Sequence, residues 1–108
     1  AKTVERLVDE NEEPYKAIAD RYLQIGCSVM TPDTKRYELL TRLIDEFQVD
    51  GVVEMTLQAC HTYAVETQSI RRLVQDRDVP FISVETDYSA ADSAQLKNRL
   101  AAFIEMMA

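Results

Sequence analysis

Two short apolar runs, each followed by a stretch with helical periodicity, constrain the fold of this chain more than any other feature. The first run, Val52–Met55, follows the helix-breaking pair Asp50-Gly51, and the second, Phe81–Val84, follows Pro80. The second run is continuously β-prone rather than alternating, which is typical of a strand that is buried on both faces of a parallel sheet. A helix between two such strands predicts a parallel βαβ unit.

Helical segments surround these strands. They are predicted over residues 3–9, 14–24, 32 to about 49, 62–75, and in the last segment, which follows Ser89 and Asp92. Thr31 and Pro32 form a typical helix start, and Ser89 with Asp92 resembles a capping box before the last helix. Helical spacing predicts these buried faces: Leu40, Leu43, Ile44 and Phe47; Ile70, Leu73 and Val74; Leu96, Leu100, Phe103, Ile104 and Met107.

The order of elements predicts an α/β, flavodoxin- or Rossmann-like layered domain, in which a βαβα unit with a small parallel sheet is preceded by helices. The length of 108 residues fits one domain over residues 1–108. Two strands are few for a sheet, so either residues 27–30 supply a third or further strands come from sequence outside this chain. Because the chain begins at Ala1 rather than Met, we expect a piece of a longer polypeptide or a processed chain.

Composition excludes several partners. The net charge of -7 and the lack of a basic stripe with interleaved aromatic residues argue against nucleic acid. No apolar run approaches the roughly 20 residues that span a bilayer, and no signal peptide is visible, so no membrane is expected. Only two cysteines occur, Cys27 and Cys60, and nothing indicates secretion; free or metal-bound thiols in a reducing cytoplasm are expected.

Ligands of open parallel sheets bind beyond the carboxyl ends of the strands. Cys60 lies in the segment after the first strand, just before a predicted helix, where the helix dipole favours a thiolate that can bind a metal or act as a nucleophile. A half-buried small hydrophobic residue is the equally weighted alternative. Cys27 lies in a loop without CxxC spacing, so we expect a structural role for it.

The other candidates at this edge each have a simpler explanation. His61, the one histidine, can bind a metal or move a proton, yet a lone loop histidine is more often solvated. Glu85 and Asp87 can form a carboxylate pair, but capping of the last helix is favoured. Glu66 can pair locally with Tyr63. No phosphate-binding glycine loop, GxSxG, HExxH or paired CxxC motif is present.

The strings DGVVEMTLQACHTYAVE and VPFISVETDYSAADSAQLKNRLAAFIEMM resemble the end of the family of 2-hydroxyacyl-CoA dehydratases and benzoyl-CoA reductases. The family shows a DGV strand, a loop with a cluster-binding cysteine, a strand ending in ExDYS, and a closing helix of the form GQLxTRxxAFxEM. The resemblance covers about residues 14–108. Ala94 and Asn98 depart from the usual glycine and threonine, and the ACHTY loop resembles a branch with a double-cubane cluster.

The resemblance implies that Cys60 is a ligand of an iron–sulfur cluster, 4Fe-4S or double-cubane, in the complete protein. His61, Tyr63, Glu85 and Tyr88 are implied as groups around the cluster, and no catalytic residue is assigned. Implied partners are a paralogous subunit or a second copy, an ATP-dependent activator protein, and an acyl-CoA or other small substrate. The implied chemistry is radical dehydration or reduction driven by low-potential electrons. A cluster takes three or four thiolates, so none is expected on this chain alone.

Two alternatives stay open. The chain can be a flavodoxin-like interaction domain that docks to a paralogous subunit, with Cys60 incidental. It can also be a thiol enzyme in which His61 activates Cys60, although adjacent residues at a helix start often point apart.

Overall fold

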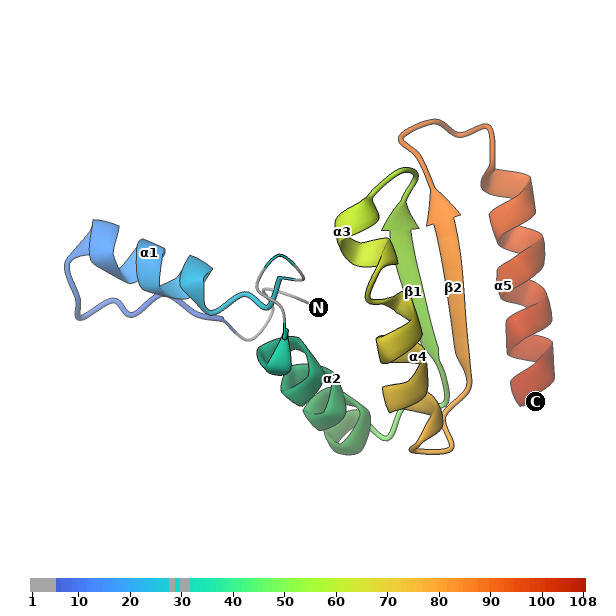
Figure 1. Ribbon diagram of the computed structural model, residues 1–108, viewed down its shortest axis with the longest axis horizontal. Helices are drawn as coiled ribbons and strands as arrows, with labels where there is room; N and C mark the ends of the chain where they lie inside the picture. The colour runs from blue at the N-terminus through green and yellow to red at the C-terminus, as the bar shows by residue number, and fades with distance from the viewer. Residues whose placement is uncertain (1–5, 28, 30–31) are drawn as a thin grey trace. The chain divides into compact units, whose positions relative to one another are not determined.

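The computed structural model describes residues 6–27, 29 and 32–108. Its elements are α1 (Pro14–Leu23), α2 (Thr34–Phe47), β1 (Val52–Leu57), α3 (His61–Ala64), α4 (Thr67–Gln75), β2 (Phe81–Thr86) and α5 (Ser93–Met107), as Figure 1 shows. The chain divides into two compact units after Leu40, so the division falls within α2. The predicted α/β class with a small parallel sheet is confirmed.

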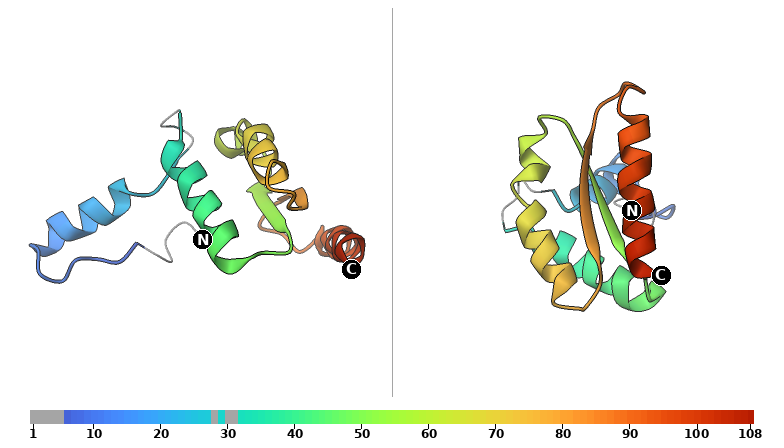
Figure 2. Two further views of the ribbon diagram at one scale, coloured as in Figure 1. Left: turned by 90° about the horizontal axis from the view of Figure 1, so that it is seen from below. Right: turned by 90° about the vertical axis from the view of Figure 1, so that its right-hand side faces the viewer.

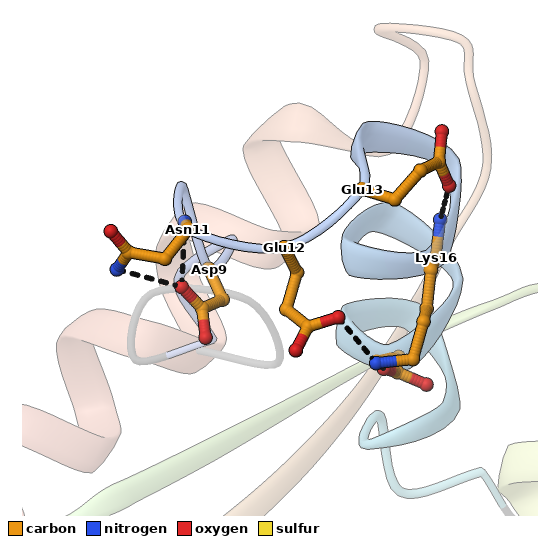
Figure 3. Close-up of polar contacts among 6 residues, drawn as sticks. Asp9, Asn11, Glu12, Glu13 and Lys16 are labelled. Carbon is orange, nitrogen blue, oxygen red and sulfur yellow. Dashed lines mark hydrogen bonds and ion pairs between the residues drawn. The ribbon is translucent and has the colours of Figure 1, made fainter.

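In the first unit, α1 begins as the sequence predicts, with Pro14 in its first turn. The Glu13 carboxylate accepts a hydrogen bond from the backbone N–H of Lys16 at 2.9 Å, which caps the helix (Figure 3). The Lys16 ammonium also pairs with Glu12. Just before the helix, the Asp9 carboxylate accepts from the backbone N–H of Asn11 at 2.9 Å. Local polar contacts therefore set the start of α1.

Two expectations for the first unit are wrong. Residues 6–9 are not helical, and the rest of the helix predicted over residues 3–9 lies outside the described residues. The helix α2 begins at Thr34 rather than at Pro32; the Asp33 carboxylate accepts from the N–H of Arg36 at 3.3 Å and so caps it. The expected cap, Thr31, lies outside the described residues, as do Ser28 and Met30 of the suggested third strand. Cys27 and Val29 are not in a strand.

The second unit contains the sheet. β1 and β2 pair in parallel, with Val52 opposite Phe81 and Leu57 opposite Thr86. Figure 2 shows α4 on one side of the strands and α5 on the other. The side chains of Val74 on α4 and Val84 on β2 are fully buried, and Ile44, Ile70 and Phe103 also belong to the buried core. The arrangement is the predicted β–α–β–α order, with a parallel crossover through α3 and α4.

The apolar run Val52–Met55 predicts a short buried strand, but β1 is only partly buried. Its burial alternates: Glu54 and Thr56 are buried, whereas Val53, Met55 and Leu57 are 45%, 61% and 39% exposed. Ser83 donates its hydroxyl to the Glu54 carboxylate at 3.1 Å, so the buried carboxylate has a partner on the neighbouring strand. Three apolar side chains of β1, those of Val53, Met55 and Leu57, are therefore exposed in this chain, whereas its polar side chains are buried.

Three helix predictions need correction as well. The single helix predicted over residues 62–75 is two helices, α3 and α4, which are separated at Val65 and Glu66. The last helix begins at Ser93 after Asp92, whose side chain makes no capping hydrogen bond, so the Ser89–Asp92 capping box is absent. Two residues of the predicted buried faces, Phe47 and Ile104, are 66% and 62% exposed.

Candidate functional site

The candidate site is the turn that links β1 to α3, at the carboxyl end of the sheet. The backbone N–H of Gln58 donates to the carbonyl of Thr86 at 2.7 Å, which continues the sheet pairing one residue past β1. The N–H of Cys60 then turns back to the carbonyl of Leu57 at 3.0 Å. Between them, Ala59 adopts a left-handed conformation with φ of 60°. This sharp turn places Cys60 directly beyond the strand end, where ligands of parallel sheets bind.

Glu85 holds this turn from the neighbouring strand. Its carboxylate oxygen Oε1 accepts a hydrogen bond from the backbone N–H of Ala59 at 3.3 Å. Glu85 and Cys60 are both candidates from the sequence, and the structure connects them through one intervening residue. Asp87, the other carboxylate at this strand end, accepts a hydrogen bond from the backbone N–H of Ser89 at 2.6 Å, in the loop before α5. The residue directly before α5 is Asp92, so neither Glu85 nor Asp87 stands at the expected capping position.

The Ser89 contacts also affect the acidity of Asp87. The Ser89 hydroxyl, and then the Ser89 backbone N–H, donate to the carboxylate and lower the pKa of Asp87 from its usual 3.8. Asp87 therefore organises the loop before α5 through its hydrogen bonds with Ser89.

Cys60 is half-buried, forms no disulfide, and stands at the residue before α3. The predicted position ahead of a helix is confirmed, but α3 is only four residues long. The backbone dipoles at Cys60 are therefore those of a single turn. The N–H groups of Cys60 and His61 already donate within the turn, to Leu57 and Ala59. These two N–H groups are therefore already bonded within the turn.

The remaining predicted residues differ in their surroundings. His61 is exposed and Tyr63 is half-buried, with the Tyr63 carbonyl accepting from the Thr67 hydroxyl at 3.4 Å. Glu66 is buried at the start of α4. Tyr88 is 93% exposed, in the loop after β2. The structure therefore ties Glu85 to the Cys60 turn and leaves His61 and Tyr88 at the surface.

Two features of this region have no clear counterpart in the sequence patterns. The left-handed Ala59 has no sequence signal, because alanine does not favour that conformation. Arg99 on α5 donates to the carbonyl of Ser83 on β2 at 2.9 Å. The sequence shows that the last helix contains an arginine, which can donate hydrogen bonds. Nothing in the sequence indicates that its acceptor is a carbonyl of β2.

Comparison with known proteins decides the family. Residues 1–107 match the family model described as 2-hydroxyglutaryl-CoA dehydratase, D-component. The chain belongs to this family. The dehydratase D-component assignment agrees with the resemblance found in the DGV, ACHTY and ETDYS segments.

Two proteins are similar to this chain over most of its length. The YjiM protein of Escherichia coli (strain K12), provisionally named a dehydratase subunit, is 52% identical over 108 residues, which are 99% of this chain and 28% of the relative. A subunit of the benzoyl-CoA reductase of Thauera aromatica is 27% identical over 99 residues, which are 88% of this chain and 22% of the relative. The chain therefore spans about a quarter of the length of these relatives.

Within the described residues, no three histidine, cysteine or acidic side chains are grouped so that they could hold a metal ion. None of the helices in that same part of the chain is long and apolar enough to cross a membrane.

Proposed function

We propose that this chain is part of an iron–sulfur subunit of a 2-hydroxyacyl-CoA dehydratase-like enzyme, and that Cys60 is one ligand of its cluster. The observation that carries the proposal is the position of Cys60: a half-buried thiol at the carboxyl end of two parallel strands, on a turn that Glu85 holds from β2. Family membership over residues 1–107 supports the same assignment. No catalytic residue is assigned.

The residues present fit a shared cluster rather than one held by this chain alone. Such clusters take up to four thiolates, and residues 1–108 contain two cysteines. Cys60 would supply one thiolate, and the remaining ligands would come from elsewhere in a longer subunit, of which residues 1–108 would form a carboxy-terminal α/β domain. When bound, a 4Fe-4S or double-cubane cluster supplies low-potential electrons for dehydration or reduction of an acyl-CoA or another small substrate.

The residues around Cys60 would position it and control its exposure to water. Glu85 keeps the Ala59–Cys60 backbone in its turn, which fixes the direction of the Cys60 Cα–Cβ bond. The half-buried Tyr63 follows in α3 and can limit water access, whereas His61 and Tyr88 are exposed and can act at the surface of the site. The partners proposed for the subunit are a paralogous subunit or a second copy, and an ATP-dependent activator protein, in the cytoplasm.

The test is the iron and acid-labile sulfide content of the complete subunit, purified without oxygen, with and without Cys60→Ser. We expect the substitution to remove most of the iron, because an alcohol is a poor cluster ligand. Cys27→Ser is the matched control: it removes the other thiol of the chain and should leave the iron content unchanged. Equal iron in wild type and Cys60→Ser would remove Cys60 from the cluster.

A second candidate function is an interaction domain that docks to a paralogous subunit, with Cys60 incidental. The exposed apolar side chains of β1 favour it, since such a surface is a typical contact region. The same iron measurement separates the two functions, because a purely docking domain keeps its iron content and activity after Cys60→Ser. The thiol-enzyme alternative receives less support, since His61 is exposed and follows Cys60 directly at the start of α3, where adjacent side chains diverge.

A further inference from the structure

The turn that carries Cys60 uses its backbone N–H groups internally. The successive N–H groups of Ala59, Cys60 and His61 all donate to acceptors of the same chain. Cys60 donates to the carbonyl of Leu57 at 3.0 Å, and His61 donates to the carbonyl of Ala59 at 3.0 Å. The N–H of Ala59 donates at 3.3 Å to Oε1 of Glu85, which reaches the turn from β2. A carboxylate therefore takes up the one N–H of this group that no local carbonyl accepts.

Hydrogen bonds of this kind bear on the reduction potential of a cluster bound at Cys60. An N–H that donates to a cluster sulfur raises the potential, because reduction makes the cluster more negative and the N–H dipole stabilises the more negative state. An N–H group that already donates to a carbonyl or a carboxylate is withdrawn from that role. The occupied N–H groups of residues 59–61 therefore favour a low potential.

Glu85 also brings a negative charge to the turn. Its carboxylate lies against the N–H of Ala59, the residue directly before Cys60. Among the described residues of the second unit, no lysine or arginine pairs with Glu85. The two segments at this end of the sheet, residues 58–66 and 85–95, contain no lysine or arginine in their sequence. A carboxylate without a cationic partner repels an added electron, which lowers the potential further.

We propose that Glu85 lowers the reduction potential of the cluster at Cys60, through its negative charge and by holding the Ala59 N–H away from the cluster sulfur atoms. This inference rests on the proposed function in one respect, namely that Cys60 is a cluster ligand. It goes further than the positioning of the turn, because an uncharged acceptor at residue 85 would hold Ala59 equally well. Low-potential electrons are what the proposed dehydration or reduction requires.

Asp87 provides a matched control for the charge of Glu85. Both carboxylates lie at the end of β2, and both are exposed. The hydrogen bonds of Asp87 come from Ser89 in the loop before α5, whereas Glu85 binds the Cys60 turn. Asp87→Asn therefore removes the same unit of charge as Glu85→Gln without altering a contact of the turn.

The test is a reductive titration of the complete subunit, purified without oxygen and followed by the EPR signal of its cluster. Glu85→Gln keeps an acceptor for the Ala59 N–H and removes the charge. We expect it to favour reduction about three- to tenfold, which raises the potential by about 30–60 mV for one electron. Asp87→Asn should produce a smaller shift. An unchanged potential in Glu85→Gln, or an equal shift in Asp87→Asn, would overturn the inference.

The contribution of the hydrogen bond is measured with Glu85→Ala. This variant removes the charge and also releases the Ala59 N–H, so we expect a potential above that of Glu85→Gln. Equal potentials in the two variants would contradict the part of the inference that concerns the N–H group.

A variant that leaves Glu85 in place gives an independent measurement. Gln58 is exposed on the same turn, and Gln58→Glu adds a second carboxylate there. We expect its potential to fall below that of the wild type. No shift would show that the cluster does not respond to charge at this turn, and would refute the inference even if the Glu85 variants failed to fold.

The iron content separates this inference from the proposed function. Glu85→Gln should retain its iron, because Cys60 and the acceptor for Ala59 are both kept. Retention of iron in Cys60→Ser would overturn the proposed function and this inference together. Loss of iron in Cys60→Ser, beside an unchanged potential in Glu85→Gln, would leave the proposed function standing and contradict the role of Glu85.

Discussion

Single residues set the geometry of the Cys60 turn. Ala59 adopts a φ of 60°, and the carboxylate of Glu85 accepts its N–H at 3.3 Å. A left-handed conformation costs a residue with a Cβ atom roughly 1–2 kcal/mol, so the turn is maintained against an intrinsic preference. The contacts around it, from Leu57, Thr86 and Glu85, supply the compensation.

Ala59→Gly should therefore stabilise the chain. Glycine reaches positive φ without the Cβ clash, and part of that gain is offset by the greater freedom of glycine in the unfolded chain, which leaves about 0.5 kcal/mol. The measurement is the midpoint of urea unfolding. Ala101→Gly, at an exposed position within α5, is the control and should cost about 1 kcal/mol, since its backbone is helical. Equal losses at both positions would show that Ala59 is not strained.

Asp87 provides a residue-scale prediction about pH. Its pKa is below the usual 3.8 because the Ser89 hydroxyl and N–H donate to it. A lowered pKa in the folded state adds stability to this loop above the unfolded value, and that addition is lost as pH falls through the lower folded value. Ser89→Ala should raise the Asp87 pKa toward 3.8, measured from the pH dependence of its carboxyl ¹³C signal; an unchanged titration would rule out the hydroxyl as the main cause.

At the scale of elements, close contacts between neighbouring segments decide the packing. Gly51, just before β1, lies against the end of α5: a Cβ atom there would approach the Met107 sulfur to 2.5 Å and the Phe103 ring to 3.1 Å. Its φ is not positive, so its role is to allow close approach rather than an unusual conformation.

An ion pair joins two helical segments of the second unit. Near the end of α2, Asp45 pairs at 3.6 Å with Arg77, which follows α4.

Gly51→Ala should destabilise the chain by about 1–3 kcal/mol, because the added methyl group overlaps with Phe103 and Met107. The midpoint of denaturant unfolding measures this loss. Met107→Ala removes the nearer of the two obstacles, so the double variant should lose less stability than the sum of the single variants. Additive losses would show that Gly51 and α5 do not contact each other in solution.

At the scale of the whole molecule, the strand β1 exposes three apolar side chains, Val53, Met55 and Leu57. The chain also has two cysteines, fewer than a cluster needs, and spans about a quarter of the length of its relatives. Under the proposed function, the further thiolates lie in the rest of a longer subunit.

The sequence by itself determined the order of the two strands and the helices that follow them, the parallel pairing, and the position of Cys60 at the strand end. These depend on local patterns: apolar periodicity, Pro14 at the start of α1, and a helix between two β-prone runs. The family, too, could be recognised from ordered motifs. Whether Cys60 binds a cluster stays a prediction.

Only the tertiary structure decided which surfaces are buried and how the site is held. Apolar character does not tell which face of β1 meets a neighbour, so the sequence does not predict Glu54 inside or Met55 outside. The contacts of Glu85 with Ala59 and of Arg99 with Ser83 join residues 26 and 16 positions apart. Such contacts depend on how separate elements approach each other in space, and no local pattern in the sequence specifies that.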